Sequence, residues 1–382
     1  MSESLNQSTY KSIPSPSFVL EEKKLIKNLE LIDHVQKSAA VSIILALKGF
    51  AMWSCFDMIR GYLKSATASS LNEAKLCTEK FGKKAHTYAV AYTDNEFEEL
   101  AHLSSHLTFN SLAQFDRFST KIPAHLSVGL RVNPEWSDVT TDLYNPAHSN
   151  SRLGLVVSSL PEILPDKIEG LHFHVLCESS AESLVTVLDH FEKKFSKYFH
   201  QIKWINMGGG HLMTSEGYNI ELLISTLKKF KEKYQIAIIL EPGSAVAWQT
   251  GFLKTSVIDI ISNEGISTAI IDASFTCHMP DCLEMPYRPF IVEGSRDEHT
   301  HEFPYRLGGV SCLAGDYLEA YSFQNTLKVG DSITFCDMMH YTMVKTSMFN
   351  GVKHPSIVLL KADDSYQLLR EFTYEDYRDR LS

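Results

Sequence analysis

A regular alternation of short apolar runs and helical segments is the feature that most constrains the fold of this chain. Eight apolar runs typical of buried β-strands occur before residue 242, and segments with helical character separate most of them. In the segment 219–234, apolar residues recur at spacings of three and four, as one buried helix face requires. The predicted strands cover 41–48, 63–68, 86–91, 106–110, 126–133, 169–176, 203–208 and 237–241.

Eight successive strand–helix units predict an α/β fold of the TIM (β/α)8 barrel type, with the stretch 134–168 as an insertion. Beyond the eighth strand, strand-like runs dominate and helical segments are short, so a mostly-β domain is expected to follow the barrel. We therefore predict a barrel domain over 20–250 and a C-terminal β domain over 251–382, to which residues 1–19 add a strand.

Composition argues against some classes of binding partner and favours one kind of cellular compartment. The net charge is −10 and no basic block occurs, which argues against nucleic acid as a partner. The seven cysteines include no CxxC motif, and only Cys277 and Cys282 are close in sequence, a usage that fits a reducing compartment. The N-terminal residues lack the apolar core of a signal peptide, and no apolar run approaches the ~20 residues that span a bilayer. A cytoplasmic protein without a membrane partner is expected.

Several chemically distinctive residues fall at the C-terminal ends of the predicted strands, where the active sites of TIM barrels lie. Lys48 closes the first strand, His172 and His174 lie late in the sixth, and Gly208–Gly210 and Glu241 close the seventh and eighth. Each has an ordinary structural explanation, such as a lysine stem lying on apolar surface or a glycine turn. Their common placement at one mouth of the barrel nevertheless favours a functional site.

These residue types have a shared chemistry. A lysine whose pKa is lowered by burial is a reactive amine that forms a Schiff base with a carbonyl compound. Glycines after a barrel strand expose backbone N–H groups to an anion, and the loops after strands seven and eight are the usual phosphate site of this fold. A histidine can stack on an aromatic ring, and a carboxylate can hold a pyridine nitrogen protonated. Together they predict pyridoxal 5'-phosphate (PLP) as the cofactor and no metal.

The order of motifs along the chain resembles the fold-type III PLP decarboxylases of the alanine racemase/ornithine decarboxylase superfamily. Within this superfamily the chain most closely resembles the carboxynorspermidine/carboxyspermidine decarboxylase family, above all in LALKGF, FNSLAQF, HMPDCLEMPYRP, SCLAGD and HYTMVKTSMFNG. The motifs in chain order are ALKGF (46–50), SSLNEA (69–74), FNSLAQF (109–115), LRVNP (130–134), SRLG (151–154), FHVLCES (173–179), NMGGGH (206–211), EPGSA (241–245), GGVSCLAGD (308–316) and HYTMVKTSMFNG (340–351).

The resemblance implies a PLP-dependent carboxy-lyase that converts carboxynorspermidine to norspermidine, carboxyspermidine to spermidine, or both, in polyamine biosynthesis. It implies that Lys48 bonds covalently to the cofactor, that His174 stacks on its ring and that Glu241 holds its pyridine nitrogen. It also implies a homodimer with a shared active site, in which Cys312 of the neighbouring subunit returns a proton to the substrate Cα. The residues implied at the phosphate are Gly208, Gly209, Gly210 and Tyr341.

Two positions depart from the ornithine decarboxylase pattern. Ser244 follows Glu-Pro-Gly where ornithine decarboxylase has an arginine, which removes one phosphate contact. Leu313 follows Cys312 where ornithine decarboxylase has an aspartate, which argues against a short diamine substrate. A longer polyamine tail would instead meet acidic residues, although an exposed acid is often only solvated. The candidates for this contact are Glu178, Asp272, Asp281 and Asp316.

Three alternatives remain open at this stage. Another decarboxylase of the same fold would act on diaminopimelate, arginine or ornithine, and the departures after Cys312 and after Glu-Pro-Gly count against it. An amino-acid racemase would carry an arginine where Glu241 stands, because in the racemase an arginine faces the pyridine nitrogen. A non-catalytic PLP-binding protein would have lost Lys48 or Cys312, and both are present.

Overall fold

The computed structural model describes residues 7–141, 145–148, 150–285 and 287–382. The chain divides into two compact units, one formed by Asn28–Val246 and the other by Met1–Lys27 together with Ala247–Ser382. We refer to them as the barrel unit and the β unit. Among the described helices, none is both long and apolar enough to cross a membrane.

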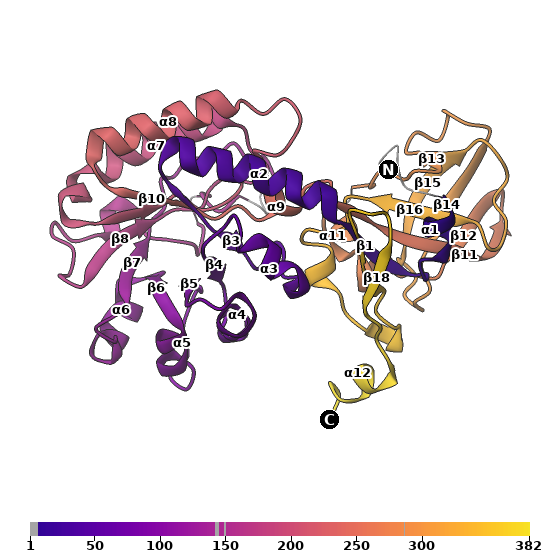
Figure 1. Cartoon of the computed structure of the whole chain (residues 1–382), viewed down its shortest axis with the longest axis horizontal. Coiled ribbons are helices and arrows are strands. Elements are labelled where there is room, and N and C mark those ends of the chain that lie inside the picture. The colour runs from indigo at the N-terminus through magenta and orange to yellow at the C-terminus, as the bar shows by residue number, and fades with distance from the viewer. Residues whose placement is uncertain (1–6, 142–144, 149, 286) are drawn as a thin grey trace. The chain divides into compact units, whose positions relative to one another are not determined.

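The barrel unit is built around a parallel sheet whose strands follow one another in chain order (Figure 1). The predicted first strand, 41–48, is split in two: β2 pairs with β10 and β3 pairs with β4, so this segment joins the two ends of the sheet. All eight predicted strand positions are occupied, and the predicted TIM-barrel class is confirmed. The strands are β2 (Ser42–Ile43), β3 (Leu45–Ala46), β4 (Ala66–Ala68), β5 (Ala85–Tyr88), β6 (Ser104–Phe109), β7 (Ser127–Arg131), β8 (Ile168–His172), β9 (Trp204–Asn206) and β10 (Ala237–Leu240).

Four helices of the barrel unit, α4, α6, α7 and α8, begin at a short polar side chain that caps them. Ser70, Ser111, Ser180 and Asn219 each accept a hydrogen bond from the backbone N–H three residues further on. The N-terminal helix α2 was not predicted, although its apolar residues recur at spacings of three and four. The helices are α2 (Glu22–Ala39), α3 (Phe56–Ile59), α4 (Leu71–Leu76), α5 (Phe97–Leu103), α6 (Leu112–Phe118), α7 (Ala181–Phe195), α8 (Ile220–Tyr234) and α9 (Ser244–Ala247). The division between the units runs within α2 and α9, so that residues 22–27 and Ala247 are counted with the β unit.

A tryptophan and two glycines shape part of the barrel core. A Cβ atom at Gly170 would lie 2.1 Å from Cε2 of Trp204, and one at Gly129 would lie 2.4 Å from its Cη2. β8, which pairs with β9, and β7, the next strand along, therefore lack side chains where the indole ring lies. Trp204 also donates from Nε1 to Oγ of Ser127 at 2.8 Å, which fixes the plane of the ring.

The β unit contains a sheet in the order β13-β15-β14-β12-β11-β1-β17-β18, with β16 pairing on β11 (Figure 1). β1 pairs antiparallel with β11 and parallel with β17, so an N-terminal strand lies between two strands from the C-terminal half. Residues 1–6 of the stretch predicted to add a strand lie outside the described residues. The strands are β1 (Ser17–Glu21), β11 (Gly251–Asn263), β12 (Ile266–Ile271), β13 (Gly294–Ser295), β14 (Phe303–Gly308), β15 (Tyr317–Phe323), β16 (Ser332–Cys336), β17 (Ser356–Leu360) and β18 (Tyr366–Arg370).

The helices of the β unit are short. Two of them, α10 and α11, follow β12, and Ser274 caps the first by accepting a hydrogen bond from the N–H of Cys277. The helices are α1 (Gln7–Ser12), α10 (Phe275–His278), α11 (Pro280–Glu284) and α12 (Tyr374–Arg378).

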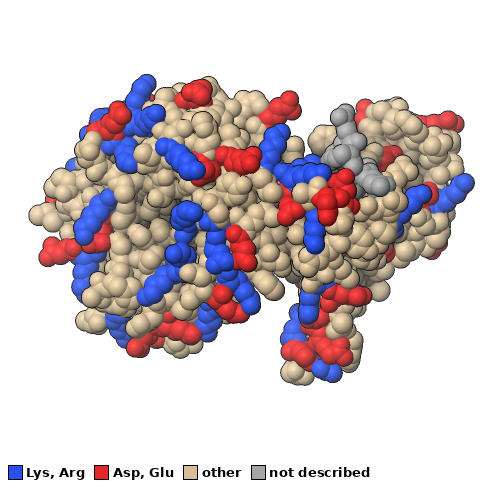
Figure 2. All heavy atoms as spheres, viewed as in Figure 1, with Lys and Arg blue, Asp and Glu red and all other residues tan. Residues whose placement is uncertain are grey.

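Charged side chains of both signs are interspersed over the face of the molecule seen in Figure 2. Several are joined in exposed ion pairs, such as Lys75 with Glu99 and Lys233 with Glu192. Exposed pairs of this kind contribute little to stability, so the fold depends on its apolar core.

Candidate active site

The ends of β3, β8, β9 and β10 bring four of the predicted site elements together at one mouth of the barrel unit. Lys48 follows β3 by two residues, His174 follows β8 by two, the glycine turn begins at Gly208 after β9, and Glu241 directly follows β10. Nζ of Lys48 lies 3.5 Å from Nε2 of His174. The backbone N–H of Glu241 donates to the carbonyl of Gly208 at 2.8 Å.

Lys48 lies at the mouth of the barrel, and its side chain is accessible to solvent. Desolvation lowers its pKa, and the nearby guanidinium of Arg131 lowers it further, while Glu241 opposes the shift. A lowered pKa increases the fraction of neutral amine, which is the nucleophilic form. The geometry therefore supports the reactive amine expected from the sequence.

His174 is held by its backbone and by its ring. The N–H of Gly209 donates to Nδ1 at 2.8 Å, so the proton of the neutral imidazole lies on Nε2, the atom that faces Lys48. Burial and the charges of Lys48 and Arg131 keep the pKa of His174 well below its usual value. Arg131 also donates to the carbonyl of His174 at 3.1 Å and packs over the ring of Tyr88.

Glu241 is 7% exposed, and both of its carboxylate oxygens have polar neighbours. Asn206 donates from Nδ2 to Oε2 at 3.0 Å, and Nε2 of His172 lies 3.2 Å from Oε1. Burial alone would raise the pKa of Glu241, but His172, His174 and Lys48 outweigh it and hold the pKa below the usual value. The group is therefore an ionised carboxylate inside the barrel.

The glycine turn is required by close packing. A Cβ atom would lie 2.5 Å from the carbonyl oxygen of Phe173 at Gly208, 2.5 Å from that of Glu241 at Gly209, and 2.1 Å from that of Leu176 at Gly210. Gly208 and Gly210 also have positive φ angles of 71° and 86°.

The N–H groups of the turn are only partly available to an anion. Side chains accept from two of them, Asn206 from Gly208 and His174 from Gly209. The N–H of Gly210 donates to no side chain of the described residues. An anion contact was expected from all three N–H groups, but in the described part of the chain only that of Gly210 is available for it.

Glu178 lies in the turn that follows His174 and has a left-handed backbone with φ of 51°. The turn is tied down by Asp138, which accepts hydrogen bonds from the hydroxyls of Ser179 and Ser183. Such strain in a residue other than glycine persists only where the surroundings enforce it. Glu178 therefore has a defined position at the mouth of the barrel unit.

The other predicted site residues belong to the β unit. Cys312 is exposed and lies on a loop whose last residue, Asp316, is 4% exposed. The carboxylate of Asp316 accepts hydrogen bonds from the N–H of Thr276, the N–H of Ser311 and the hydroxyl of Ser311. On the other side of the loop, Oδ1 of Asn350 accepts from the N–H of Cys312 at 3.0 Å. Asp316 therefore organises the loop that carries Cys312.

Asp281 differs from Asp316 because one of its oxygens has no hydrogen-bond partner among the described residues. Its Oδ2 accepts from the hydroxyls of Tyr287 and Thr342, each at 2.9 Å. Its Oδ1 is buried and accepts no hydrogen bond from any described residue, an arrangement that costs free energy unless a donor is supplied. Tyr341, with φ of 48°, directly precedes Thr342.

Asp272 directly follows β12, at the end of its pairing with β11. Its Oδ1 accepts from the N–H of Ser256 at 2.9 Å, and its own N–H donates to the carbonyl of Ser256. Lys254 is close enough to lower its pKa partly, although burial raises the pKa overall. These contacts give Asp272 a local role in the pairing of β11 with β12.

Three residues with direct contacts to the site were not assigned a role from the sequence: Arg131, Asn206 and Asn350. Each lies inside a motif that marks the family resemblance, LRVNP, NMGGGH or HYTMVKTSMFNG. In the sequence, the feature that could have identified them as site residues is their position near the end of a predicted strand or next to a glycine. Their partners are distant in sequence, so only the tertiary structure identifies the contacts.

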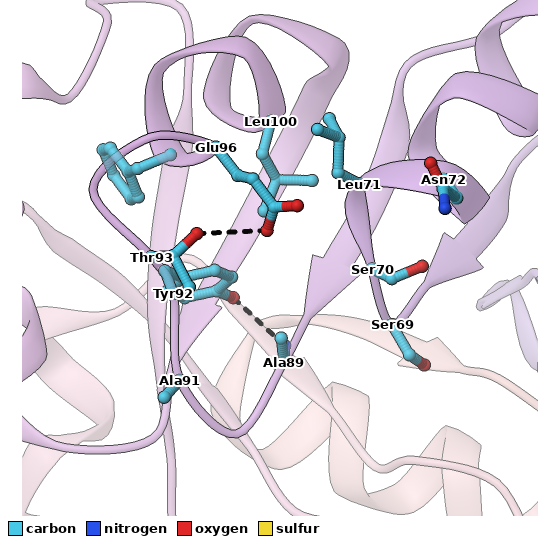
Figure 3. A pocket seen from close by; sticks show the side chains of 11 residues that line it. Ser69, Ser70, Leu71, Asn72, Ala89, Ala91, Tyr92, Thr93, Glu96 and Leu100 are labelled. Carbon is cyan, nitrogen blue, oxygen red and sulfur yellow. Dashed lines mark hydrogen bonds between the residues drawn. The ribbon is translucent and has the colours of Figure 1, made fainter. Parts of the chain in front are cut away.

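A separate cavity of about 180 Å³ lies in the barrel unit beyond the ends of β4 and β5 (Figure 3). Within it, Thr93 donates to Glu96 and the N–H of Ala89 donates to the hydroxyl of Tyr92. The predicted site residues are not among those that line it. The lining residues are Ser69, Ser70, Leu71, Asn72, Ala89, Ala91, Tyr92, Thr93, Glu96, Phe97 and Leu100.

Comparison with known proteins identifies the class. Residues 155–339 match the family model of the pyridoxal-dependent decarboxylase C-terminal sheet domain. The chain is 50% identical over 372 residues to carboxyaminopropylagmatine decarboxylase of Synechocystis sp., covering 97% of this chain and 96% of the relative. It is 45% identical over 378 residues to carboxynorspermidine/carboxyspermidine decarboxylase of Campylobacter jejuni, covering 96% and 98%. The crystal structure of carboxynorspermidine decarboxylase from Campylobacter jejuni, complexed with norspermidine, superposes with a TM-score of 0.90 at 44% identity, covering 96% and 100%.

The fold and these matches are those of a PLP enzyme. The chain belongs to the pyridoxal-dependent decarboxylase family, together with the carboxynorspermidine/carboxyspermidine decarboxylases. The predicted resemblance, the decarboxylase activity and PLP as the cofactor are therefore confirmed. The described residues fit this cofactor, since they offer an amine of lowered pKa, an ionised buried carboxylate and a turn without side chains.

Proposed function

We propose that this enzyme removes the α-carboxylate of a carboxylated polyamine, converting carboxynorspermidine to norspermidine, carboxyspermidine to spermidine, or both. The observation that carries the proposal is the pairing of Lys48 with His174 at 3.5 Å, at the same barrel mouth as the ionised Glu241. The relative from Campylobacter jejuni, at 45% identity, supports the substrate class.

Each residue of the barrel mouth is proposed to have one task. When bound, PLP supplies an aldehyde that bonds to an amine and a ring that takes up the electron pair released as CO₂ leaves. Lys48 would hold the aldehyde carbon through its amine, and the same neutral amine would replace the product amine at that carbon. Glu241 would face the ring nitrogen and keep it protonated. His174, whose orientation is set by Gly209, would cover one face of the ring.

The phosphate is proposed to bind at the glycine turn. The N–H of Gly210 supports this, because it donates to no side chain of the described residues. The N–H groups of Gly208 and Gly209 already donate to side chains. Tyr341 remains a proposed phosphate contact from the β unit. Because Ser244 stands after Glu-Pro-Gly where an arginine would contact the phosphate, more of the anion binding is proposed to rest on backbone N–H groups.

Cys312 is proposed to return the proton to Cα from the partner subunit of a homodimer. Its exposure in the β unit supports this proposal, because a thiol buried in its own unit could not reach another site. Exposed apolar side chains on the same loop and on the neighbouring segment suit a protein interface, namely Val310 (40%), Leu313 (46%) and Phe349 (45%). The seven free cysteines support a reducing, cytoplasmic setting.

Recognition of the polyamine tail is proposed to involve Asp281 and Glu178. The unpaired Oδ1 of Asp281 supports the first, because a substrate ammonium would supply the missing donor. The enforced backbone of Glu178 supports the second. Asp272 and Asp316 are less suited, because backbone groups of their own unit already occupy them.

A second candidate substrate is carboxyaminopropylagmatine, favoured by the relative at 50% identity from Synechocystis sp.. This compound ends in a guanidinium group, whereas the carboxylated triamines end in an ammonium. A carboxylate accepts a guanidinium through two parallel hydrogen bonds and an ammonium through one. The two candidate substrates therefore require different hydrogen-bond geometries from the acidic residues that bind them.

The test is CO₂ release from purified enzyme with five compounds: carboxyspermidine, carboxynorspermidine, carboxyaminopropylagmatine, diaminopimelate and ornithine. We expect turnover of the carboxylated polyamines, and loss of both the cofactor absorbance band and activity in Lys48→Ala. Turnover of diaminopimelate or ornithine alone would overturn the proposed substrate class. A cofactor band without turnover of any of the five compounds would overturn the proposed substrates and indicate a different carboxylated amine.

A second test addresses Cys312. Removal of a general acid typically costs 10²- to 10⁴-fold in rate, so Cys312→Ala is expected to lower kcat by about that factor. Cys336→Ala in the same unit is the matched control and should retain the native kcat. Native turnover in Cys312→Ala would exclude the thiol as the proton donor.

A further inference from the structure

The side chain of Asn206 contacts two parts of the candidate site at once. Asn206 ends β9 and is 5% exposed. Its Nδ2 donates to Oε2 of Glu241 at 3.0 Å, and its Oδ1 accepts from the N–H of Gly208 at 2.9 Å. One amide group therefore joins the carboxylate after β10 to the glycine turn after β9.

The orientation of this amide follows from its partners. A backbone N–H can only donate, so the amide oxygen must face Gly208, and the NH₂ group must then face Glu241. The other oxygen of Glu241 lies 3.2 Å from His172, whose ring packs edge-on against Tyr88 at 5.3 Å. The carboxylate thus accepts a hydrogen bond from Asn206 at one oxygen and has the imidazole of His172 next to the other.

The contact to Gly208 extends to the rest of the site. Gly208 has a positive φ of 71° and no room for a side chain, so the acceptor supplied by Asn206 fixes a turn that few residues could adopt. The next N–H along the chain, that of Gly209, donates to His174, and His174 in turn faces Lys48. A continuous series of contacts therefore connects Glu241 to Lys48 through Asn206.

We propose that Asn206 is a positioning residue that couples the two cofactor-holding elements of the barrel, the Glu241 carboxylate and the glycine turn. It orients the carboxylate with its NH₂ group and the turn with its oxygen. An asparagine performs both tasks because its two ends are a donor and an acceptor, whereas a carboxylate offers acceptors alone. The inference rests on the roles proposed for Glu241 and the turn.

The two contacts can be removed separately. Asn206→Asp keeps an acceptor for Gly208 but replaces the neutral amide donor with a second carboxyl group beside Glu241. Two neighbouring carboxyl groups are not both ionised, so Glu241 is no longer held as a fully ionised carboxylate. Asn206→Leu, of similar size, removes both contacts. We expect Asn206→Asp to bind PLP within about threefold of the native affinity. Its kcat should fall on the order of tenfold, and its cofactor absorbance bands should differ from those of the native enzyme. We expect Asn206→Leu to lose on the order of tenfold in PLP affinity as well.

The readouts are PLP affinity of the apoprotein by fluorescence titration, the absorbance spectrum of the PLP-bound enzyme, and kcat with KM. Asn133→Leu is the matched control, because Asn133 is a buried asparagine two residues after β7 that accepts from the N–H of Glu135 and not from the glycine turn. It should resemble Asn206→Leu in thermal stability but keep the native spectrum.

A native spectrum in Asn206→Asp would refute the contact to Glu241 as a positioning contact, and native PLP affinity in Asn206→Leu would refute the contact to the turn. Glu241→Gln separates this inference from the proposed function. If Glu241→Gln leaves the spectrum unchanged, the role proposed for Glu241 fails, whereas the affinity measurement still tests the turn.

Discussion

Oδ1 of Asn350 accepts a hydrogen bond from the backbone N–H of Cys312 at 3.0 Å, joining two residues that lie 38 positions apart and belong to different family motifs. Asn350 makes this contact from a left-handed backbone conformation with φ of 57° and ψ of 12°. The loop of Cys312 is thus held by Asn350 on one side and by Asp316 on the other. The proposed proton donor therefore has an ordered backbone despite its exposure.

Asn350→Gly is expected to lower kcat by roughly 3- to 10-fold without loss of folding stability. Glycine adopts the left-handed conformation without strain, so the variant removes the acceptor alone, and one hydrogen bond contributes about 1 kcal/mol. Asn350→Asp keeps an acceptor and should recover most of the rate. The measurement is kcat together with the rate at which iodoacetamide alkylates Cys312. Equal rates in all three proteins would mean that the contact does not position the thiol.

Gly170→Ala is expected to lower the melting temperature by several degrees. The added Cβ would lie 2.1 Å from the indole of Trp204, and overpacking of this kind costs about 1–3 kcal/mol. Gly315→Ala is the control, because a Cβ there meets no atom within 4 Å. The double variant Gly170→Ala with Trp204→Phe should recover part of the loss. A melting temperature equal to that of Gly315→Ala would contradict the packing argument.

Lys254→Met is expected to release the N-terminal segment of the β unit. The side chain of Lys254, in a residue only 4% exposed, donates to the carbonyls of Tyr10 at 2.8 Å and Ile13 at 2.7 Å, and hydrogen bonds of charged groups contribute about 1.5–3 kcal/mol. Its ammonium also lies 4.6 Å from the ring centroid of Tyr10. Limited proteolysis should cut within residues 7–16 faster than in the native protein.

Lys11→Met provides the comparison for this experiment, because Lys11 is an exposed lysine of the same segment. It should be cut at the native rate. If both variants behave alike, the hydrogen bonds of Lys254 do not retain the segment.

Acidification is expected to destabilise the protein between about pH 6.5 and 4. Burial lowers the pKa of His278 to about 3 and that of His211 to about 4. The unfolded chain binds these protons near pH 6.5, so below that pH the unfolded state takes up more protons and the free energy of unfolding falls. At pH 5 each histidine accounts for about 2 kcal/mol of this loss.

His278→Asn tests the assignment, because an asparagine oxygen can replace Nδ1 as acceptor for the N–H of Ser274. The variant should lose less stability than the native protein when the pH is lowered from 7 to 5, as measured by the melting temperature with saturating PLP. An unchanged pH dependence would show that His278 does not titrate on unfolding.

The sequence by itself determined the eight strand positions, the class of barrel and the residues that stand at the strand ends. Strand and helix periodicities are local properties, and the side chain that follows a strand stays at the same end of the sheet wherever the barrel closes. For this reason Lys48, His174 and Glu241 were predicted together and are found at one mouth. The helix α2 was missed although its periodicity is present in the sequence.

Only the tertiary structure decided which polar groups are already engaged. Asp316 and Asp281 look alike in the sequence, but the first accepts three hydrogen bonds from its own unit and the second keeps a buried oxygen without a partner among the described residues. The bridge made by Asn206 depends in the same way on residues two and 35 positions away. Hydrogen-bond partners are set by packing between distant segments, and no local pattern encodes them.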